Sequence, residues 1–244
     1  MIMKKKRQEE SNMIGIIGAM EEEVNQLKEA MEQVSVDTRA SMEFCRGTLD
    51  GRQVVVVRSG IGKVNAAVCT QILADVYGVK AVINTGIAGS LKAQIDIGDI
   101  VLSTDTLQHD MDAEAFGYPA GQIPRMDTLS FRADEELIRC AEECCRRVNP
   151  DIRTFRGRVL SGDQFIADRE KKEWLVNTFD GFCTEMEGAA IGQAAYLNGI
   201  PFLVVRAISD KADDSASMDY PEFEAKAISH TVALMKDMVK HLNL

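Results

Sequence analysis

Acidic side chains stand where two apolar runs of this sequence end. Glu21, Glu22 and Glu23 follow "MIGIIGAM", and Asp210 follows Ser209 at the end of "PFLVVRAISD". A glycine turn that opens a helix normally presents free backbone N–H groups to a phosphate, which these carboxylates would repel. Two carboxylates in different environments can instead divide acid and base duties, as in hydrolysis of a glycosidic bond through a cation-like transition state. The pattern predicts that chemistry without naming a substrate.

Of the three consecutive glutamates, Glu23 is the candidate for catalysis. At about 100° per residue, the helix that they open has one apolar stripe. The stripe consists of Met20, Val24, Leu27 and Met31. Glu23 lies beside it, whereas Glu21 and Glu22 point away and need no role beyond favouring the positive end of the helix dipole.

Two further acidic sites allow two interpretations each. Asp210, with Arg206 and Ser209 nearby, is a plausible proton donor, although acids in turns at strand ends are common. The segment "TEMEGAA" has the spacing of a capping box, in which Glu187 bonds back to the Thr184 amide. From the residues alone, we favour the cap over a ligand-binding role for Glu187.

Other motifs argue against a phosphate loop and against a metal centre. "SGIGK" lacks the glycine and the hydroxyl that a P-loop needs at Val57 and Val64. The six cysteines form no CxxC pair; Cys140 and Cys144 are one helical turn apart, but no histidine follows at zinc-finger spacing. We expect reduced cysteines in a cytoplasmic protein, with no metal and no cofactor. His109, in "LQHDMDAEAFGY", is either a ligand contact or, as we favour, part of a solvated loop.

Composition limits the class of protein and of partner. A chain of 244 residues that is 45% hydrophobic can bury a substantial core, and its net charge of −10 argues against nucleic acid or an anionic membrane as partner. No apolar run approaches the ~20 residues that span a membrane. The start, "MIMKKKRQEESN", lacks the apolar region of a signal peptide. We therefore expect a disordered extension over 1–12, one domain over 13–244, and a small neutral or cationic ligand.

The elements that must position the acidic residues alternate along the chain. Short β-rich runs such as "QVVVVRSG" and "AVINTG" alternate with segments of helical periodicity such as "DEELIRCAEECCRRV". This alternation predicts an α/β fold, a single-domain three-layer sandwich with a central twisted sheet and helices on both faces. Asp50-Gly51 marks a hairpin, so the sheet is mixed. Ligands bind beyond the carboxyl ends of strands in such folds, and we expect four strand ends to share one cleft: 18–20, 59–62, 85–89 and 209–210.

Nine motifs, in order, carry a resemblance to a known family. They are "GIIGAMEEE", "SGIGKVNAA", "NTGIAGS", "GDIVLS", "HDMDAEAFGY", "GQIP", "SGDQFI", "TEMEGAAI" and "VVRAISD". Together they resemble bacterial 5′-methylthioadenosine/S-adenosylhomocysteine nucleosidases, within the nucleoside phosphorylase superfamily. The match runs from Met13 to the C-terminal helix. It implies a nucleoside phosphorylase-like fold and a hydrolase of methionine salvage that cleaves methylthioadenosine, S-adenosylhomocysteine and 5′-deoxyadenosine to adenine and a substituted ribose.

The resemblance also implies roles for individual residues. Glu23 would activate the attacking water, Asp210 would protonate N7 of adenine, and Glu187 would hold the ribose hydroxyls, a role that then outweighs the cap. Further substrate contacts would come from Met20, Ile61, Ile87, Gly89, Phe165, Ile166, Met186, Arg206, Ser209 and Tyr220. Phe165 would stack on adenine, and the backbone of Ile166 would bond its edge. A homodimer is implied, in which Phe116 and Pro124 reach the neighbouring active site.

One departure from the family concerns Ile87. The family commonly has serine there, in "NTGSAGG", where the hydroxyl touches the region of the attacking water. With isoleucine, water positioning would rest on Glu23 and Arg206, which predicts a lower rate or a reshaped pocket.

Three alternatives stay open. A purine nucleoside phosphorylase would need phosphate and yield ribose-1-phosphate. A sister hydrolase acting on an aminofutalosine would share the acid, the base and the purine contacts. A non-catalytic adenosine-binding module would need neither Glu23 nor Asp210.

Overall fold

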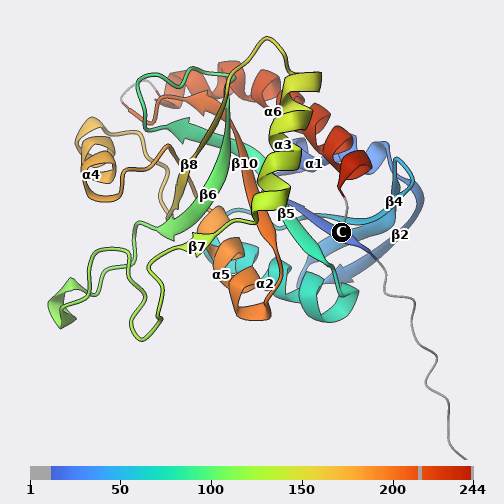
Figure 1. The fold of residues 1–244 in the computed structure, drawn as a ribbon, viewed down its shortest axis with the longest axis horizontal. Coiled ribbons are helices and arrows are strands. Elements are labelled where there is room, and N and C mark those ends of the chain that lie inside the picture. Colours follow the sequence, from blue (N-terminus) through green and yellow to red (C-terminus); the bar gives the residue numbers. More distant parts are fainter. Residues whose placement is uncertain (1–11, 214–215, 243–244) are drawn as a thin grey trace, which may run out of the picture.

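A computed structural model describes residues 12–213 and 216–242, with the side chains of 217–222 excepted. Within these residues the chain forms a mixed sheet covered by helices on both faces, the three-layer α/β sandwich expected from the sequence (Figure 1). Apart from Asn12, the N-terminal extension lies outside the described residues, as does the side chain of Tyr220.

Ten strands make up the sheet in the described part of the chain, and nine of them follow in the order β10-β6-β8-β9-β5-β1-β4-β3-β2, with β7 paired to β6. Their bounds are β1 Ile14–Gly18, β2 Glu32–Arg39, β3 Met42–Leu49, β4 Arg52–Arg58, β5 Ala81–Ser90, β6 Ile100–Gln108, β7 Phe131–Arg132, β8 Thr154–Ser161, β9 Cys183–Glu185 and β10 Phe202–Asp210. The strands β1, β4, β5 and β10 are parallel to one another, and β3 is antiparallel to β4.

One half of the sheet closes on itself. Strand β10 pairs with β5 on one side and β6 on the other, and β5 also pairs with β9, which pairs with β8, which pairs with β6. These five strands therefore form a small ring. Every residue of β5 and of β10 is buried, as expected for strands that are covered on both faces.

The helices pack on the two faces in separate groups (Figure 1). Helices α1 (Glu21–Glu29), α3 (Glu135–Val148) and α6 (Ala216–His241) cover one face; α2 (Lys63–Ile72), the π-helical turn η1 (Leu73–Tyr77) and α5 (Gly188–Asn198) cover the other. Helix α4 (Arg169–Phe179) packs on a smaller apolar cluster, and a 3-10 turn, η2 (Glu114–Phe116), lies in the loop after β6. No described helix is long and apolar enough to cross a membrane.

The predicted hairpin is confirmed. Asp50 and Gly51 join β3 to β4, and both have positive φ, 50° and 81°, the conformation that a two-residue type I′ turn requires. The mixed character of the sheet follows from this turn.

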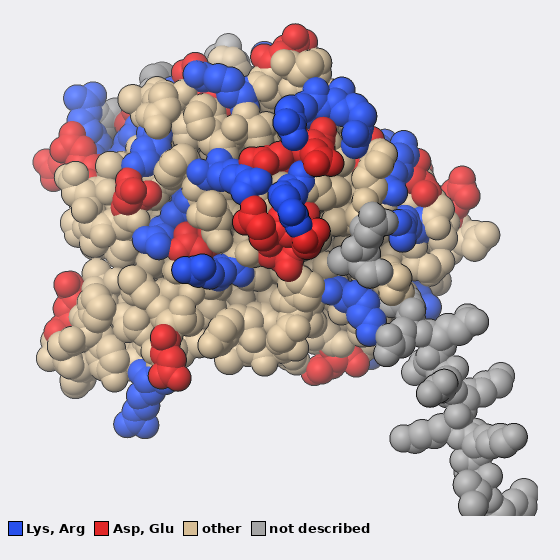
Figure 2. Space-filling view, viewed as in Figure 1, with Lys and Arg blue, Asp and Glu red and all other residues tan. Residues whose placement is uncertain are grey.

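Charged side chains of both signs alternate on the face shown in Figure 2. Arg156 pairs with Glu135 and with Glu142, and Arg158 pairs with Asp105. Among the described residues of the face in Figure 2, basic and acidic side chains are interspersed, without a continuous basic patch of the kind that binds a nucleic acid backbone.

Candidate active site

A cavity of about 260 Å³ lies where several strand ends meet. The β1–α1 turn, the β4–α2 loop and the ends of β5, β9 and β10 all contribute to its wall, so the four strand ends that we expected in one cleft do meet there. The predicted site residues in the wall are Met20, Glu23, Ile61, Ile87, Gly89, Phe165, Met186, Glu187, Ser209 and Asp210.

Glu23 is buried in this wall and its carboxylate accepts three backbone hydrogen bonds. Oε2 accepts from the N–H groups of Ala19 (2.6 Å) and Met20 (3.0 Å), and Oε1 accepts from that of Ile87 (3.2 Å). As the third residue of α1, it reaches back over the helix start, which also satisfies donors that the helix leaves free. Glu21 and Glu22 are exposed, as the helical periodicity predicts.

Burial raises the pKa of Glu23, while Arg206 and the three backbone donors act against that rise. The net effect is a raised pKa, so this carboxyl takes up a proton more readily than an exposed glutamate does. Such a shift suits a general base that works near neutral pH.

Glycine at position 86 of strand β5 leaves room for the side chains of Glu23 and Arg206. A Cβ there would lie 2.5 Å from Oε1 of Glu23 and 3.0 Å from Nη1 of Arg206. The first distance is too short for any side chain and the second is very tight, so glycine allows the carboxylate and the guanidinium to come together beside the strand.

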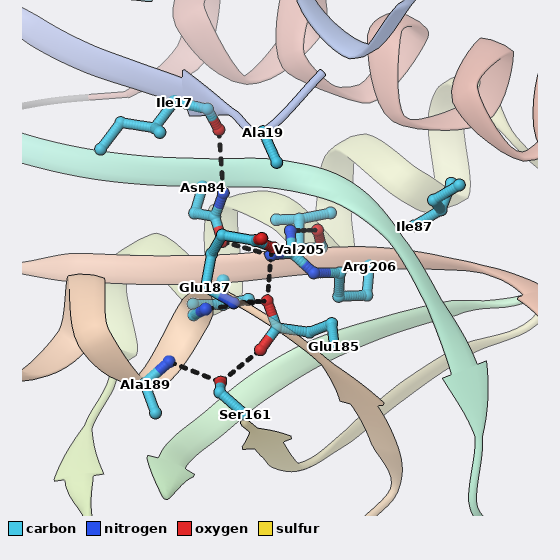
Figure 3. A network of polar contacts seen from close by, with 12 residues as sticks. Ile17, Ala19, Asn84, Ile87, Ser161, Glu185, Glu187, Ala189, Val205 and Arg206 are labelled. Atoms are coloured by element: carbon cyan, nitrogen blue, oxygen red, sulfur yellow. Dashed lines mark hydrogen bonds and ion pairs between the residues drawn. The ribbon is translucent and has the colours of Figure 1, made fainter. Parts of the chain in front are cut away.

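Behind the cavity wall, Arg206 is the centre of a buried polar network (Figure 3). Its Nη2 donates to Oδ1 of Asn84 and to Oε2 of Glu185, and it lies 4.0 Å from Oε2 of Glu187. Burial alone would lower the pKa of Arg206, but the carboxylates of Glu185, Glu23 and Glu187 raise it. Arg206 is therefore a permanent cation that is already neutralised. Among the described residues its Nε has no partner.

The expected capping box at α5 is wrong. Thr184 belongs to β9, and its hydroxyl finds no partner within the described chain. Glu185 caps the helix instead, because its Oε2 accepts from the N–H groups of Glu187 (3.1 Å) and Gly188 (2.8 Å). The other carboxylate oxygen of Glu185 accepts from the hydroxyl of Ser161.

Glu187 is consequently released from capping. Its Oε1 accepts from the N–H of Gly62 at 2.8 Å, across the cavity mouth. Burial, followed by the charge of Glu185, raises the pKa of Glu187 to about 8. A carboxyl with this pKa can both donate and accept hydrogen bonds near neutral pH.

Asp210 is placed by an irregularity at the end of β10. The register with β5 shifts between Ile208 and Asp210, so that Ser209 and Asp210 both face the cavity, whereas successive residues of a regular strand face opposite sides. Oδ2 of Asp210 accepts from the Ser209 hydroxyl (2.8 Å), and Oδ1 accepts from the N–H of Ala212 (2.7 Å). The carboxyl is held rigidly with hydrogen bonds on both oxygens.

Several predicted site residues lie elsewhere. The side chain of Ile166 packs with Leu175 and Phe179 of α4, outside the cavity wall. Phe116 is 83% exposed and Pro124 is also exposed, and neither lines the cavity. Phe165 lines it but is 53% exposed, so its ring stands at the rim.

Sequence reasoning missed Glu185 and misplaced His109. Glu185 and Glu187 stand two residues apart at a strand end, and this spacing was the available signal that both belong to the site. His109 is buried, and neither ring nitrogen finds a partner among the described residues, so the solvated loop that we favoured is wrong. Burial lowers the pKa of His109 to about 4, which keeps its ring neutral.

Known proteins match the whole described fold. The model of the phosphorylase superfamily matches residues 13–240. The 5′-methylthioadenosine/S-adenosylhomocysteine nucleosidase of Anoxybacillus flavithermus is 42% identical over 94% of this chain and 99% of its own. The Neisseria meningitidis nucleosidase of the same name, solved with methylthio-immucillin-A, superposes with a TM-score of 0.91 at 36% identity, covering 95% of this chain and 100% of that one.

A futalosine hydrolase of Helicobacter pylori is also similar, with a TM-score of 0.90 at 33% identity over 95% of this chain and 98% of its own. Both enzyme types thus share this fold, while the curated relatives that match almost end to end at about 40% identity carry the nucleosidase name. The chain therefore belongs to the phosphorylase superfamily and, within it, to the family of 5′-methylthioadenosine/S-adenosylhomocysteine nucleosidases.

Proposed function

We propose that this protein hydrolyses the N-glycosidic bond of 5′-methylthioadenosine and S-adenosylhomocysteine, and of 5′-deoxyadenosine, to adenine and the substituted ribose. One observation carries the proposal: two buried carboxyl groups, Glu23 and Asp210, stand in the wall of one cavity with different sets of partners. Such a pair can divide the roles of base and acid. The names of the relatives supply the substrate class.

Asp210 is the proposed acid. It carries a proton to N7 of adenine, so that the base leaves with the electron pair of the C1′–N9 bond. The hydroxyl of Ser209 and the N–H of Ala212 fix the direction of the carboxyl during this transfer. Phe165 at the rim stacks on adenine, and the backbone of Ile166 bonds its edge.

Glu23 is the proposed base. It takes a proton from a water molecule whose oxygen forms the new bond to C1′ as the bond to N9 breaks. The backbone donors of Ala19, Met20 and Ile87 hold its carboxylate in place. The charge of Arg206 acts on this carboxyl, and its buried Nε has no partner among the described residues. Oriented acid and base groups of this kind contribute ~10²–10⁴-fold each.

The remaining residues of the cavity bind the sugar. Glu187 accepts from the ribose hydroxyls, and Met186 packs beside the ring. Met20 and Ile61 form the pocket for the 5′ substituent. Gly89 leaves room at the adenine end, because a Cβ there would lie 2.7 Å from Oδ1 of Asp210.

Water, rather than phosphate, is the proposed nucleophile. The buried cation of the site, Arg206, is bonded to Glu185, and the carboxyl groups of Glu23 and Glu187 in the cavity wall supply no positive charge. A phosphate dianion would therefore find no uncompensated cation in the described wall to replace its hydration. This charge balance argues against the phosphorylase alternative.

The same proposal includes the cellular compartment, the pathway and the oligomeric state. We expect a cytoplasmic enzyme of methionine salvage that works as a homodimer, without a cofactor. Phe116 and Pro124 reach the neighbouring active site in this dimer; the 83% exposure of Phe116 supports a surface made for a partner.

A base-release assay tests the proposed function. Methylthioadenosine, S-adenosylhomocysteine, adenosine and inosine are incubated with the enzyme, with and without phosphate. We expect adenine and an unphosphorylated sugar from the first two, at a rate independent of phosphate and of chelators. A phosphorylated sugar would establish the phosphorylase instead, and binding without turnover would establish the adenosine-binding module.

The second candidate is hydrolysis of an aminofutalosine, which the similarity to the futalosine hydrolase of Helicobacter pylori favours. Including 6-amino-6-deoxyfutalosine among the substrates separates the two hydrolases. A kcat/KM for it well above that for methylthioadenosine would replace our first choice.

A further inference from the structure

We propose that a single Zn²⁺ ion binds between helices α3 and α6, at Cys140, Cys144, Asp237 and His241. The two helices pack against each other (Figure 1). Each contributes two potential ligands one helical turn apart, so that each pair points to the same side of its helix. None of these residues lines the active-site cavity.

The ligand atoms are close enough to share one ion. One atom each from Cys144, Asp237 and His241 lie within 4.8 Å of one another. The sulfur of Cys140 lies 4.0 Å from that of Cys144. Because a Zn–S bond is about 2.3 Å long, two thiolates in a tetrahedral site stand roughly 3.8 Å apart. The two sulfurs therefore need to move by only a few tenths of an ångström.

The cluster already surrounds a positive charge. Arg147 extends into it. Its Nε donates to Asp237 (2.7 Å), and its Nη2 donates to the sulfur of Cys144 (3.3 Å) and to Nδ1 of His241 (3.2 Å). A guanidinium has no acceptor, so this last contact presents the free lone pair of Nδ1 to the centre of the cluster. The acceptor atoms of three different side chains therefore converge on one cation.

The imidazole has a competing partner within its own helix. Nδ1 of His241 also lies 2.8 Å from the carbonyl oxygen of Asp237, a contact that needs the other tautomer. A metal ion selects the tautomer with the lone pair on Nδ1, and so favours the arrangement that already faces Arg147.

The ion can reach the site because part of the cluster is open to solvent. The side chain of His241 is 50% exposed and that of Arg147 is 47% exposed. A surface hollow of about 330 Å³ is lined by Cys140, Cys144, Arg147 and His241. Arg147 can therefore turn outward into solvent while the ion takes its place.

The donor set selects the metal. Two thiolates, one imidazole and one carboxylate form a mixed sulfur, nitrogen and oxygen site, which suits Zn²⁺ and is unsuited to Mg²⁺ or Ca²⁺. Because the four ligands come from two helices, the ion would clamp the C-terminal turns of α6 to α3.

A metal titration tests the proposal. The full-length, reduced and metal-free protein is titrated with Co²⁺, which is then displaced with Zn²⁺. We expect one equivalent of Co²⁺ to bind with a thiolate-to-metal charge-transfer band that Zn²⁺ abolishes. Loss of one ligand in Cys140→Ser or His241→Gln should weaken Zn²⁺ binding at least about 100-fold, since even partners of ligands contribute 10–100-fold. Neither residue is fully buried, so both variants should fold.

The Arg147→Gln variant distinguishes a metal site from a plain ion-pair cluster. Removal of the Arg147 guanidinium should tighten Zn²⁺ binding by about 10-fold or more, because the two cations no longer repel each other. Cys45→Ser and Lys240→Gln are matched controls, the first a cysteine on another element and the second a neighbour of His241, and both should bind like the wild type. Absence of saturable binding, a Co²⁺ spectrum without the thiolate band, or equal affinity in His241→Gln would overturn the proposal.

Discussion

Glu23 serves two purposes with one carboxylate. Its oxygens accept from Ala19 and Met20 at the start of α1 and from Ile87 on β5, so it joins the helix to the strand while it stands in the cavity wall. A glutamine can accept some of these bonds, but its NH₂ group must then face a backbone donor. The proposed catalytic contribution of this residue and its structural contribution are therefore partly separable.

We predict that Glu23→Gln and Asp210→Asn each lower kcat by about 10²–10⁴-fold, the usual contribution of a general acid or base, while far-UV circular dichroism stays that of the wild type. Glu21→Gln and Glu22→Gln are matched controls, since both glutamates are exposed at the same turn. Equal losses in the controls would contradict the choice of Glu23, and an active Asp210→Asn would remove protonation of N7 from the mechanism.

The raised pKa of Glu187 predicts a pH-dependent stability. A carboxyl whose pKa rises from 4.5 to about 8 on folding binds its proton more tightly in the folded state. Its contribution is fully present below about pH 4.5 and is lost as pH rises through 8. Glu187→Gln has no carboxyl at this position and so lacks this loss. The Tm of the variant minus the Tm of the wild type should therefore be at least ~3 °C larger at pH 9 than at pH 5. The size follows because ~1 kcal/mol shifts Tm by 2–4 °C in a chain of this size.

Scanning calorimetry of the ligand-free enzymes over this pH range is the measurement. Glu22→Gln, an exposed carboxyl of the active-site turn, is the control and should follow the wild type at every pH. A constant difference between Glu187→Gln and the wild type would show that Glu187 is ionised throughout.

Substitution of Ile87 tests how much a serine hydroxyl at this position would contribute to the rate. Ile87→Ser keeps the backbone N–H that binds Glu23 and adds one hydrogen-bond partner for the attacking water, worth roughly 0.5–1.5 kcal/mol. We predict a threefold to tenfold higher kcat on methylthioadenosine, by the usual conversion of barrier height to rate, with little change in KM. The cost is stability, because the isoleucine side chain packs into the core beneath α6.

Steady-state kinetics on several 5′-substituted adenosines checks this, with Ile87→Val as the control that trims the side chain without adding a hydroxyl. A lower kcat/KM for Ile87→Ser on every substrate would mean that the residue has another role.

At the scale of elements, the site depends on very short distances between strand β5 and the side chains that pack against it. We predict that Gly86→Ala lowers kcat/KM by at least 10²-fold, because the added methyl would displace Glu23 or Arg206, and misplacement by about 1 Å can cost 10²-fold. Gly51→Ala is the matched control. That glycine faces open space in the β3–β4 turn with φ of 81°, so its substitution should lower the Tm and leave kcat/KM unchanged. The reverse pattern would mean that β5 tolerates a side chain at 86.

The elements with strong local patterns were predictable, and the weakly patterned ones were not. The buried β1, β4, β5, β6, β8 and β10 show apolar runs, and the hairpin has its two-residue signal. Strand β2 is exposed along its whole length, so it shows no alternation, and its first residues continue the helical pattern of α1. Strands β7 and β9 have two and three residues, too few for any periodicity, and α4 lacks a continuous apolar stripe.

The site was predictable where a residue's own helix or strand positions it. The periodicity of α1 turns Glu23 inward, and the end of β10 carries Asp210. The choice of Glu185 over Thr184 as the cap depended on β9, an element that the sequence does not reveal. Likewise, Cys144 comes near His241 only because α3 packs on α6, and no spacing along the chain encodes that contact.

At the scale of the whole molecule, the exposed loop after β6 predicts an assembly. We expect a homodimer, with Phe116 of one subunit at the active site of the other. Phe116→Ser should shift the sedimentation equilibrium toward monomer and raise KM at least about tenfold, because a large aromatic contact contributes several kcal/mol to an interface. Val36→Ser, which removes another exposed apolar side chain on β2, is the control and should change neither value. A fully active wild-type monomer would contradict the shared site.

The ring of strands also determines how this enzyme is inactivated. Strand β10, which carries Arg206 and Asp210, is hydrogen-bonded along both edges between Val205 and Ala207, so it cannot fray from the sheet in the way that an edge strand does. Its amide protons should exchange with solvent only through global unfolding. As long as the molecule stays folded, Asp210 and Arg206 therefore keep their positions. On heating, the activity and the fold should be lost in one transition.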